Sequence, residues 1–396
     1  MNQVAPSERA PARAVGKSAR ELLLKWHRYL GLVLALFVIV HGLTGSVLAF
    51  HGEIDNRLTA DVLSVQAHHE PLPINQLTAI VQARDPTATV TGMFFGERAD
   101  EAYTYRVKPH EPAASKKEVW IDPYNGQIRG ERLIGTARLD RLHLMSSLHL
   151  LHSTLLMGPT GEAILASVAA CWFVTLLIGL YLAWSRAGSR WQMFAVKRGA
   201  SRFRLWFDLH RAAGLVILLI LLSTTLCATY LNAPNVFRSV LGVVVPTTPP
   251  VQSALPQREA EPTRITPEQA IARVQRDAPN ATVRGIYFHP KLAAYELRAR
   301  VAGDINVRNG TGRYFVDTRN GSLISKRSYR EGGTSGDRLL AWMYPLHSGQ
   351  AFGWFGRIVI CLSGLVAPLL AISGIYIYLR KRLVPSRRKR IATTAG

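Results

Sequence analysis

Four apolar segments decide what this chain can fold into, because each is long enough to cross a lipid bilayer. A helix needs about 20 apolar residues to span the hydrocarbon core. With 48% hydrophobic residues and a mean hydropathy of +0.08, the 396-residue chain is too apolar for a typical soluble enzyme. We therefore predict a mainly α membrane protein with four transmembrane helices in a bundle. The four segments, all without Lys, Arg, Asp or Glu, are Tyr29–Phe50, Ala163–Trp184, Ala212–Leu231 and Ile358–Leu379.

The net charge of +22 is concentrated beside these segments. Residues 1–28 carry six Lys and Arg against two Glu, residues 185–211 carry seven against one Asp, and residues 380–396 carry seven against none. Positively charged flanks stay in the cytoplasm. Both termini are therefore expected inside, with residues 51–162 and 232–357 outside. Since the charge is explained by topology, we expect no nucleic-acid partner.

The chain is an internal duplication, and its two copies align in several places. HRYLGL at 27–32 recurs as HRAAGL at 210–215, and HSTLLMGPTG at 152–161 recurs as HSGQAFGWFG at 347–356. Each copy contains two spans, so both enter the membrane in the same direction. They are then related by a pseudo-twofold axis along the membrane normal. Equivalent residues of the two copies should face one another at equal depth.

The exterior segments repeat as well. VTGMFF at 90–95 matches VRGIYF at 283–288, and WIDPYNGQI at 120–128 matches FVDTRNGSL at 315–323. Ahead of these strands, residues 74–90 and 266–283 share an apolar helical period. We predict that each exterior unit is one helix followed by strands, with Asn-Gly at a tight hairpin turn.

Four histidines form two pairs under this duplication. His27 matches His210 near the inner face, and His152 matches His347 near the outer face. Two imidazoles that face each other inside a helix bundle suit the axial ligation of haem iron. A histidine at a membrane interface is ordinary, but matched recurrence at both faces favours two non-covalent haem b groups, one for each pair. Zinc takes the same nitrogen ligands, but no carboxylate or thiol completes a tetrahedral set.

Three other histidines lack a counterpart in the other copy. His41 lies in the same predicted span as His27, fourteen residues later and on nearly the same side of the helix, and its equivalent is Thr224. His149 and His51 lie near the outer face. His41 is predicted either to replace a rim histidine as ligand of the outer haem or to be a hydrogen-bond partner between the two haems. His149 and His51 are either alternative ligands of the outer haem or ordinary interface histidines.

Several motifs together resemble the PepSY-associated transmembrane family, the iron-regulated inner-membrane proteins. They occur in the family's order over residues 20–383, and the exterior units resemble α+β PepSY domains. Within that family the chain is most similar to ferrisiderophore reductases of the FoxB type. The matching pieces are WHRYLGL, LTGSVLAFHGEID, LHSTLLMGPTGE, DLHRAAGL, PLHSGQAFGWFGR and SGIYIYLRKR.

The resemblance implies an enzyme of the bacterial inner membrane that reduces Fe(III) in periplasmic siderophores and so releases Fe(II). The cytoplasmic segments are too short for a flavin or nicotinamide domain, so electrons would come from a separate cytoplasmic reductase or from membrane quinol. The alternative is a haem-free PepSY scaffold that binds or regulates a periplasmic partner. A transporter is disfavoured, because the spans carry no charged residue to couple ions.

The expected organisation alternates membrane helices with periplasmic domains. The predicted parts are a cytoplasmic basic tail (1–25), transmembrane helix 1 (26–50), a PepSY-like domain with its outer-face segment (51–157), transmembrane helix 2 (158–184), a cytoplasmic basic loop (185–205), transmembrane helix 3 (206–231), a second PepSY-like domain with its outer-face segment (232–352), transmembrane helix 4 (353–379) and a cytoplasmic basic tail (380–396).

Overall fold

The computed structural model describes residues 12–68, 70–111, 115–184, 190–257 and 263–383. The chain separates into two compact units. The helical unit comprises residues 1–46, 164–229 and 362–396, and the sheet unit comprises residues 47–163 and 230–361. The predicted basic tails and the predicted loop at 185–205 lie partly outside the described residues.

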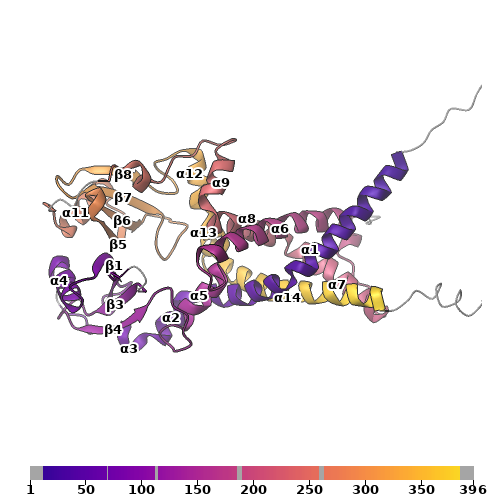
Figure 1. Ribbon diagram of the computed structural model, residues 1–396, viewed down its shortest axis with the longest axis horizontal. Coiled ribbons are helices and arrows are strands. Elements are labelled where there is room, and N and C mark those ends of the chain that lie inside the picture. Colours follow the sequence, from indigo (N-terminus) through magenta and orange to yellow (C-terminus); the bar gives the residue numbers. More distant parts are fainter. Residues whose placement is uncertain (1–11, 69, 112–114, 185–189, 258–262, 384–396) are drawn as a thin grey trace, which may run out of the picture. The chain divides into compact units, whose positions relative to one another are not determined.

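Within the described residues, three helices are long and apolar enough to cross a membrane, or four spans if one bent pair counts as a single span. The first, second and fourth predicted spans correspond to α1 (Ala12–Leu48), α6 (Pro159–Trp184) and α14 (Gly353–Leu383) (Figure 1). The α1 helix ends two residues before the predicted boundary at Phe50. These helices agree with a multi-pass membrane protein.

The third predicted span is not one straight helix. It consists of α7 (Arg202–Val216) and α8 (Leu218–Asn232), which meet at an angle of 63°. The prediction of one helix over 206–231 was therefore too simple, because the apolar composition of a segment reports its length and not its straightness. No proline lies at the bend, and Gly214, three residues before it, does not account for it, because the equivalent Gly31 lies inside the unbroken α1.

The helical unit has a small apolar core to which α1, α8 and α14 contribute Leu34, Leu221 and Ala367. Close packing of α1 on α14 depends on a glycine. A Cβ atom at Gly42 would lie 2.6 Å from the carbonyl oxygen of Gly364. Small residues allow helix backbones to approach in this way inside a membrane.

The sheet unit contains, in its described residues, an eight-stranded antiparallel sheet in the order β4-β3-β2-β1-β5-β6-β7-β8. Each copy of the repeat supplies four strands, and the two halves join where β1 pairs with β5. The strands are β1 (Thr89–Phe94), β2 (Tyr103–Lys108), β3 (Lys117–Ile121), β4 (Ile128–Leu133), β5 (Thr282–His289), β6 (Ala294–Arg300), β7 (Gly312–Asp317) and β8 (Leu323–Arg327).

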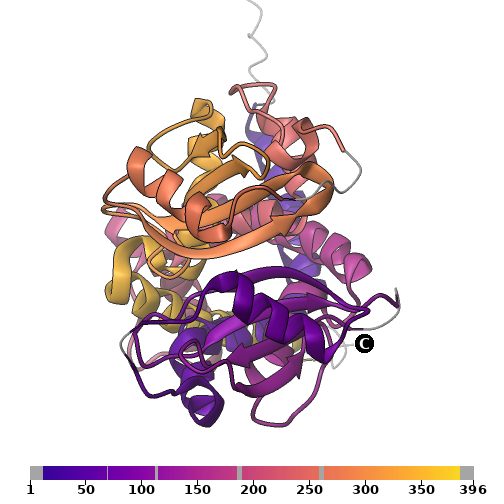
Figure 2. The same cartoon turned by 90° about the vertical axis from the view of Figure 1, so that its left-hand side faces the viewer.

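One face of this sheet is covered by α4 (Ile74–Arg84) and α11 (Pro267–Asp277), one helix from each copy (Figures 1 and 2). Leu77, Val274 and Ile286 are fully buried between these helices and the strands. Alternate residues of each strand point into this core, as the period of two requires. The order of one helix followed by strands agrees with the prediction from the repeats.

The Asn-Gly hairpins are longer than the sequence predicted. The backbone N–H of Gly126 donates to the carbonyl of Asp122 at 2.9 Å, and Gly126 has φ +74°. The connection from β3 to β4 is thus a four-residue loop at 123–126, where Asn-Gly commonly forms a two-residue turn. The equivalent Gly321 has φ +72°.

Shorter helices complete the sheet unit and carry the outer histidines. The helices are interrupted ahead of the Gly-Pro-Thr-Gly sequence, since α5 ends at Thr154 and α6 begins at Pro159. Leu155 ends α5 in the left-handed conformation, with φ +52°. The shorter helices are α2 (His51–Leu58), α3 (Ala60–Leu63), α5 (Leu144–Thr154), α9 (Pro234–Leu241), α10 (Val251–Ala254), α12 (Ser335–Ala341) and α13 (Met343–Ser348), and the 3₁₀ turns of this unit are η2 (Pro290–Leu292) and η3 (Gln350–Phe352). The 3₁₀ turn η1 (Arg190–Met193) lies in the helical unit.

Asp337 anchors the N-terminus of α12 to the segment after α9. Its carboxylate accepts hydrogen bonds from the Thr248 hydroxyl at 2.6 Å, the Thr334 backbone N–H at 3.0 Å and Arg238 at 2.9 Å. Burial opposes ionisation, but these hydrogen bonds outweigh it and hold the pKa of Asp337 well below its usual range. The folded state therefore favours the ionised carboxylate.

The variant Asp337→Asn is expected to be less stable than the native protein by about 2 kcal/mol at pH 7. Because the folded pKa is lowered, the charge stabilises the fold above the unfolded pKa of about 3.9, and the difference should shrink as the pH falls below that value. Thermal unfolding of the detergent-solubilised protein measures this difference in stability. Asp100→Asn is the control, because Asp100 forms an exposed ion pair with Arg98 and should matter little.

Candidate functional site

The helical unit brings His27 of α1 and His210 of α7 together. Their ring centroids lie 6.4 Å apart, with 82° between the ring planes. These two residues occupy equivalent positions of the duplication. Their rings lie next to each other, as the pseudo-twofold relation inferred from the sequence predicts. Two collinear metal–imidazole bonds of about 2 Å each would place the ring centres about 6 Å apart. The observed separation therefore suits two axial ligands on one metal.

Hydrogen bonds set the tautomer of both imidazoles. His27 Nδ1 donates to the backbone carbonyl of Thr175 at 3.1 Å. His210 Nδ1 lies 2.8 Å from Ser373 Oγ, whose own proton goes to the carbonyl of Leu370 at 2.9 Å, so His210 is again the donor. With the proton on Nδ1, each neutral ring keeps the lone pair on Nε2. This is how histidine ligands of metals are commonly oriented.

A glycine lies against each of these imidazoles. A Cβ atom at Gly179 would lie 3.0 Å from His27 Cε1, and one at Gly374 would lie 3.5 Å from His210 Cε1. Gly179 and Gly374 are equivalent positions of the two copies. Glycines in membrane helices commonly serve close helix packing, but these two lie at the imidazole rings.

The sheet unit brings the second predicted pair together. His152 of α5 and His347 of α13 have ring centroids 6.2 Å apart, with 56° between the ring planes. This separation again suits two axial ligands on one metal. Both predicted pairs are thus assembled, one in each unit of the chain.

A third imidazole pair was not foreseen as a pair. His51 of α2 and His149 of α5 have ring centroids 6.3 Å apart. Arg308 donates from Nη1 to His51 Nδ1 at 3.2 Å. Burial and the positive charge of Arg308 lower the pKa of His51 to about 4, so this ring is neutral at physiological pH. A neutral ring that accepts at Nδ1 carries its proton on Nε2.

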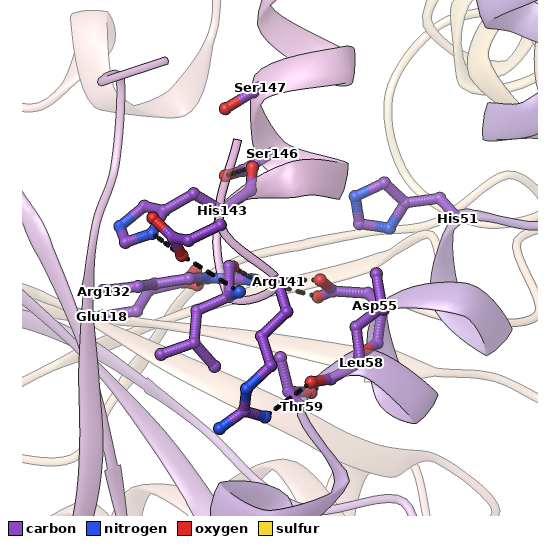
Figure 3. Close-up of polar contacts among 12 residues, drawn as sticks. His51, Asp55, Leu58, Thr59, Glu118, Arg132, Arg141, His143, Ser146 and Ser147 are labelled. Atoms are coloured by element: carbon purple, nitrogen blue, oxygen red, sulfur yellow. Dashed lines mark hydrogen bonds and ion pairs between the residues drawn. The ribbon is translucent and has the colours of Figure 1, made fainter. Parts of the chain in front are cut away.

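A buried ion cluster holds α2 and α5 in place around this pair (Figure 3). Arg132 of β4 lies 3.0 Å from Asp55 of α2 and 2.7 Å from Glu118 of β3, and its side chain is 12% exposed. It also donates to the carbonyl of Leu142, just before α5. His143 accepts from the backbone N–H of Leu133 at Nε2 and donates from Nδ1 to Asp140. These contacts fix the helices from which His51, His149 and His152 project.

His41 lies on α1 in the helical unit. Its Nδ1 donates to the carbonyl of Phe37 at 2.9 Å, one helical turn earlier, and its ring lies 6.4 Å from the ring of Phe37. Both roles considered from the sequence, ligand of the outer haem and hydrogen-bond partner between the two haems, remain predictions.

The donor set fits haem better than a bare ion. In the ranges that the structure describes, no three His, Cys, Asp or Glu side chains come together as a metal site. Zinc takes three or four protein ligands, whereas haem iron takes four nitrogens from its macrocycle and needs at most two from the protein. Paired imidazoles at ligand spacing, with glycine beside the inner pair, fit a haem group at each pair.

Comparison with protein-family models decides the family. The model of the PepSY-associated transmembrane region matches residues 24–381. The chain belongs to the PepSY-associated transmembrane family. A comparison with curated proteins gives no match. The family match spans both imidazole pairs and the whole sheet, so the histidines lie inside the region that defines the family.

Proposed function

We propose that this chain is a di-haem b reductase of the bacterial inner membrane, similar to the FoxB-type ferrisiderophore reductases. It passes electrons across the bilayer to Fe(III) held by a siderophore in the periplasm. In this proposal the termini are cytoplasmic, and the sheet unit, which corresponds to the two predicted PepSY domains, is periplasmic.

The observation that carries this proposal is the pairing of equivalent histidines at ligand spacing in both units. Separations of 6.4 and 6.2 Å at two sites, each made by two histidines that the duplication relates, are difficult to explain by interface histidines alone. The hydrogen bonds of His27 and His210 add to it, because they leave Nε2 of each ring as a lone-pair donor. A buried imidazole inside a membrane is costly and usually functional.

Each residue has a defined task in this proposal. His27 and His210 would hold the inner haem, and His152 and His347 the outer one. Bound haem b supplies reversible one-electron transfer. The Thr175 carbonyl and the Ser373 hydroxyl orient the inner imidazoles, and the polarity of these contacts raises the basicity of the ligand nitrogens.

The substrate chemistry follows from the ligand preferences of iron. Siderophores bind Fe(III) through hard oxygen donors and bind Fe(II) far more weakly. Adding one electron converts Fe(III) to Fe(II) and releases the metal, with no bond made to the protein. The electron comes from a partner outside this chain, either a cytoplasmic reductase or membrane quinol.

An absorption spectrum tests the proposal. Protein purified in detergent from cells supplied with haem precursor should show a Soret band and, after dithionite, sharp α and β bands typical of six-coordinate haem b. Quantification as the pyridine complex should give two haems per chain. A preparation without a Soret band would contradict the proposal and favour the haem-free PepSY scaffold, in which the paired histidines have no assigned role.

A further inference from the structure

At the centre of the sheet, on the face opposite α4 and α11, equivalent residues of the two copies lie side by side. Where β1 pairs with β5, Gly92 lies opposite Tyr287 and Gly285 lies opposite Phe94. A Cβ atom at Gly285 would lie 2.6 Å from Phe94 Cδ1, and one at Gly92 would lie 3.1 Å from Tyr287 Cδ1. Each aromatic ring therefore lies across the glycine of the other copy, with ring centroids 5.3 Å apart.

An arginine flanks each side of this aromatic pair. Arg106 pairs with Gly92 across β1 and β2, and Arg298 pairs with Gly285 across β5 and β6, so the two arginines are equivalent. The Arg106 guanidinium carbon lies 4.7 Å from the centre of Phe94, and that of Arg298 lies 4.6 Å from the centre of Tyr287. Arg106 also donates to the Tyr287 hydroxyl at 3.1 Å. We call these four side chains the arginine platform.

A carboxylate lies beside each arginine of the platform, and the second copy has one more arginine there. In copy one, Arg106 lies 3.5 Å from Glu118, and in copy two the buried carboxylate of Glu296 lies 3.3 Å from Arg298 and 3.8 Å from Arg313. The register places Arg313 of copy two where copy one has Glu118, since these residues pair with Arg298 and Arg106 respectively. Residues 232–357 carry 17 Lys and Arg against 9 Asp and Glu, whereas residues 51–162 carry 11 against 14. The duplication has thus diverged towards a basic second half.

The platform is reachable from solvent and lies on the side of the sheet towards the outer histidines. The side chains of its two arginines, Arg106 and Arg298, are 41% and 27% exposed, and that of the neighbouring Arg313 is 52% exposed. Within the sheet unit this face is turned towards α2, α5 and α13 (Figure 1). The loop after β6 reaches the same helices, because Arg308 contacts His51.

We propose that the arginine platform binds an anionic, aromatic ferric chelate of the tris-catecholate class. This inference rests on the proposed function and names the substrate class. Guanidinium groups bind paired anionic oxygens in a bidentate way and stack on aromatic rings. A trianionic complex with aryl rings offers both contacts at once, whereas a neutral tris-hydroxamate complex offers no net charge and no ring.

Binding of gallium(III) complexes tests the platform, because Ga(III) resembles Fe(III) in charge and size and is not reduced. Equilibrium dialysis of the full-length protein in detergent would compare a hexadentate tris-catecholate complex with a hexadentate tris-hydroxamate complex. We expect the tris-catecholate complex to bind at least about tenfold more tightly, and its binding to weaken as salt is raised.

Substitutions of the two arginines test whether the tris-catecholate complex binds at the platform. Arg106→Gln and Arg298→Gln should each weaken tris-catecholate binding by about tenfold or more, and Arg298→Lys should weaken it less, because it keeps the charge but loses the bidentate fork. Arg84→Gln is the matched control, since Arg84 lies on α4 at the opposite face. A native far-ultraviolet spectrum for each variant shows that the fold is retained.

Three results would overturn the inference: equal affinity for both complexes, equal weakening by Arg84→Gln, or displacement of the complex by anionic lipid vesicles. The outcome is separable from the proposed function, because gallium binding needs neither haem nor an electron. Protein that reduces ferric complexes but binds the gallium complex independently of both arginines would refute the platform alone. Protein that binds it through these arginines but has no Soret band would refute the reductase proposal alone.

Discussion

His27→Ala and His210→Ala should each lower the haem content of the purified protein from two per chain to one. Under the proposed function, removing either imidazole would remove one of the two nitrogen lone pairs that would hold the inner haem, which the Thr175 and Ser373 contacts orient. Even changes next to a metal ligand commonly cost 10- to 100-fold in affinity, so loss of the ligand itself should cost at least about as much. Electron transfer from dithionite across the membrane to a ferric chelate on the periplasmic side should fall together with the haem content.

The pyridine complex measures haem content, and inverted membrane vesicles loaded with a ferric chelate measure transfer across the bilayer. His68→Ala is the matched control, because His68 packs on Tyr124 in the sheet unit and belongs to neither pair. It should retain both haems. If His27→Ala and His210→Ala keep full haem content and full reducibility, the inner pair does not hold haem.

The sequence predicted much of the fold because the duplication and the apolar segments are strong signals. Segments 163–184 and 358–379 lie inside α6 and α14, and the repeated exterior segments form equivalent halves of one sheet. The bend at Ile217 could not be predicted, because no proline marks it and Gly214, three residues earlier, has its equivalent Gly31 inside the unbroken α1. The joining of the halves through β1 and β5 was equally hidden, since neither strand carries a signal for its partner.

The candidate site, too, could be predicted only in part from the sequence. His27 with His210 and His152 with His347 could be paired from the sequence, because the duplication relates them. His51 and His149 could not, since their equivalents are Pro234 and Tyr344 and only the packing of α2 on α5 brings them together. The contact to the Thr175 backbone carbonyl also escaped prediction, because a carbonyl group is present at every residue.

Under the proposed function, two imidazole pairs of the sheet unit are candidates for holding the outer haem, and their hydrogen bonds distinguish them. His51 accepts a hydrogen bond from Arg308 at Nδ1 and therefore carries its proton on Nε2, so neither nitrogen offers a free lone pair. His152 and His347 are equivalent positions of the duplication, like the inner pair. We therefore expect His152→Ala and His347→Ala to lose the outer haem, while His51→Ala keeps both haems.

Haem content and the reduced spectrum of the four variants His51→Ala, His149→Ala, His152→Ala and His347→Ala decide between the pairs. Loss of one haem in the last two variants alone assigns the outer site to the duplicated pair, and the inner haem serves as an internal reference in each sample. Loss in His149→Ala together with retention in His152→Ala would make His149 the ligand and contradict the symmetric assignment. His149 and His152 lie three residues apart on the same helix, α5. A general disruption of α5 would therefore remove haem in both of these variants. In that case His347→Ala, which lies outside α5, assigns the site.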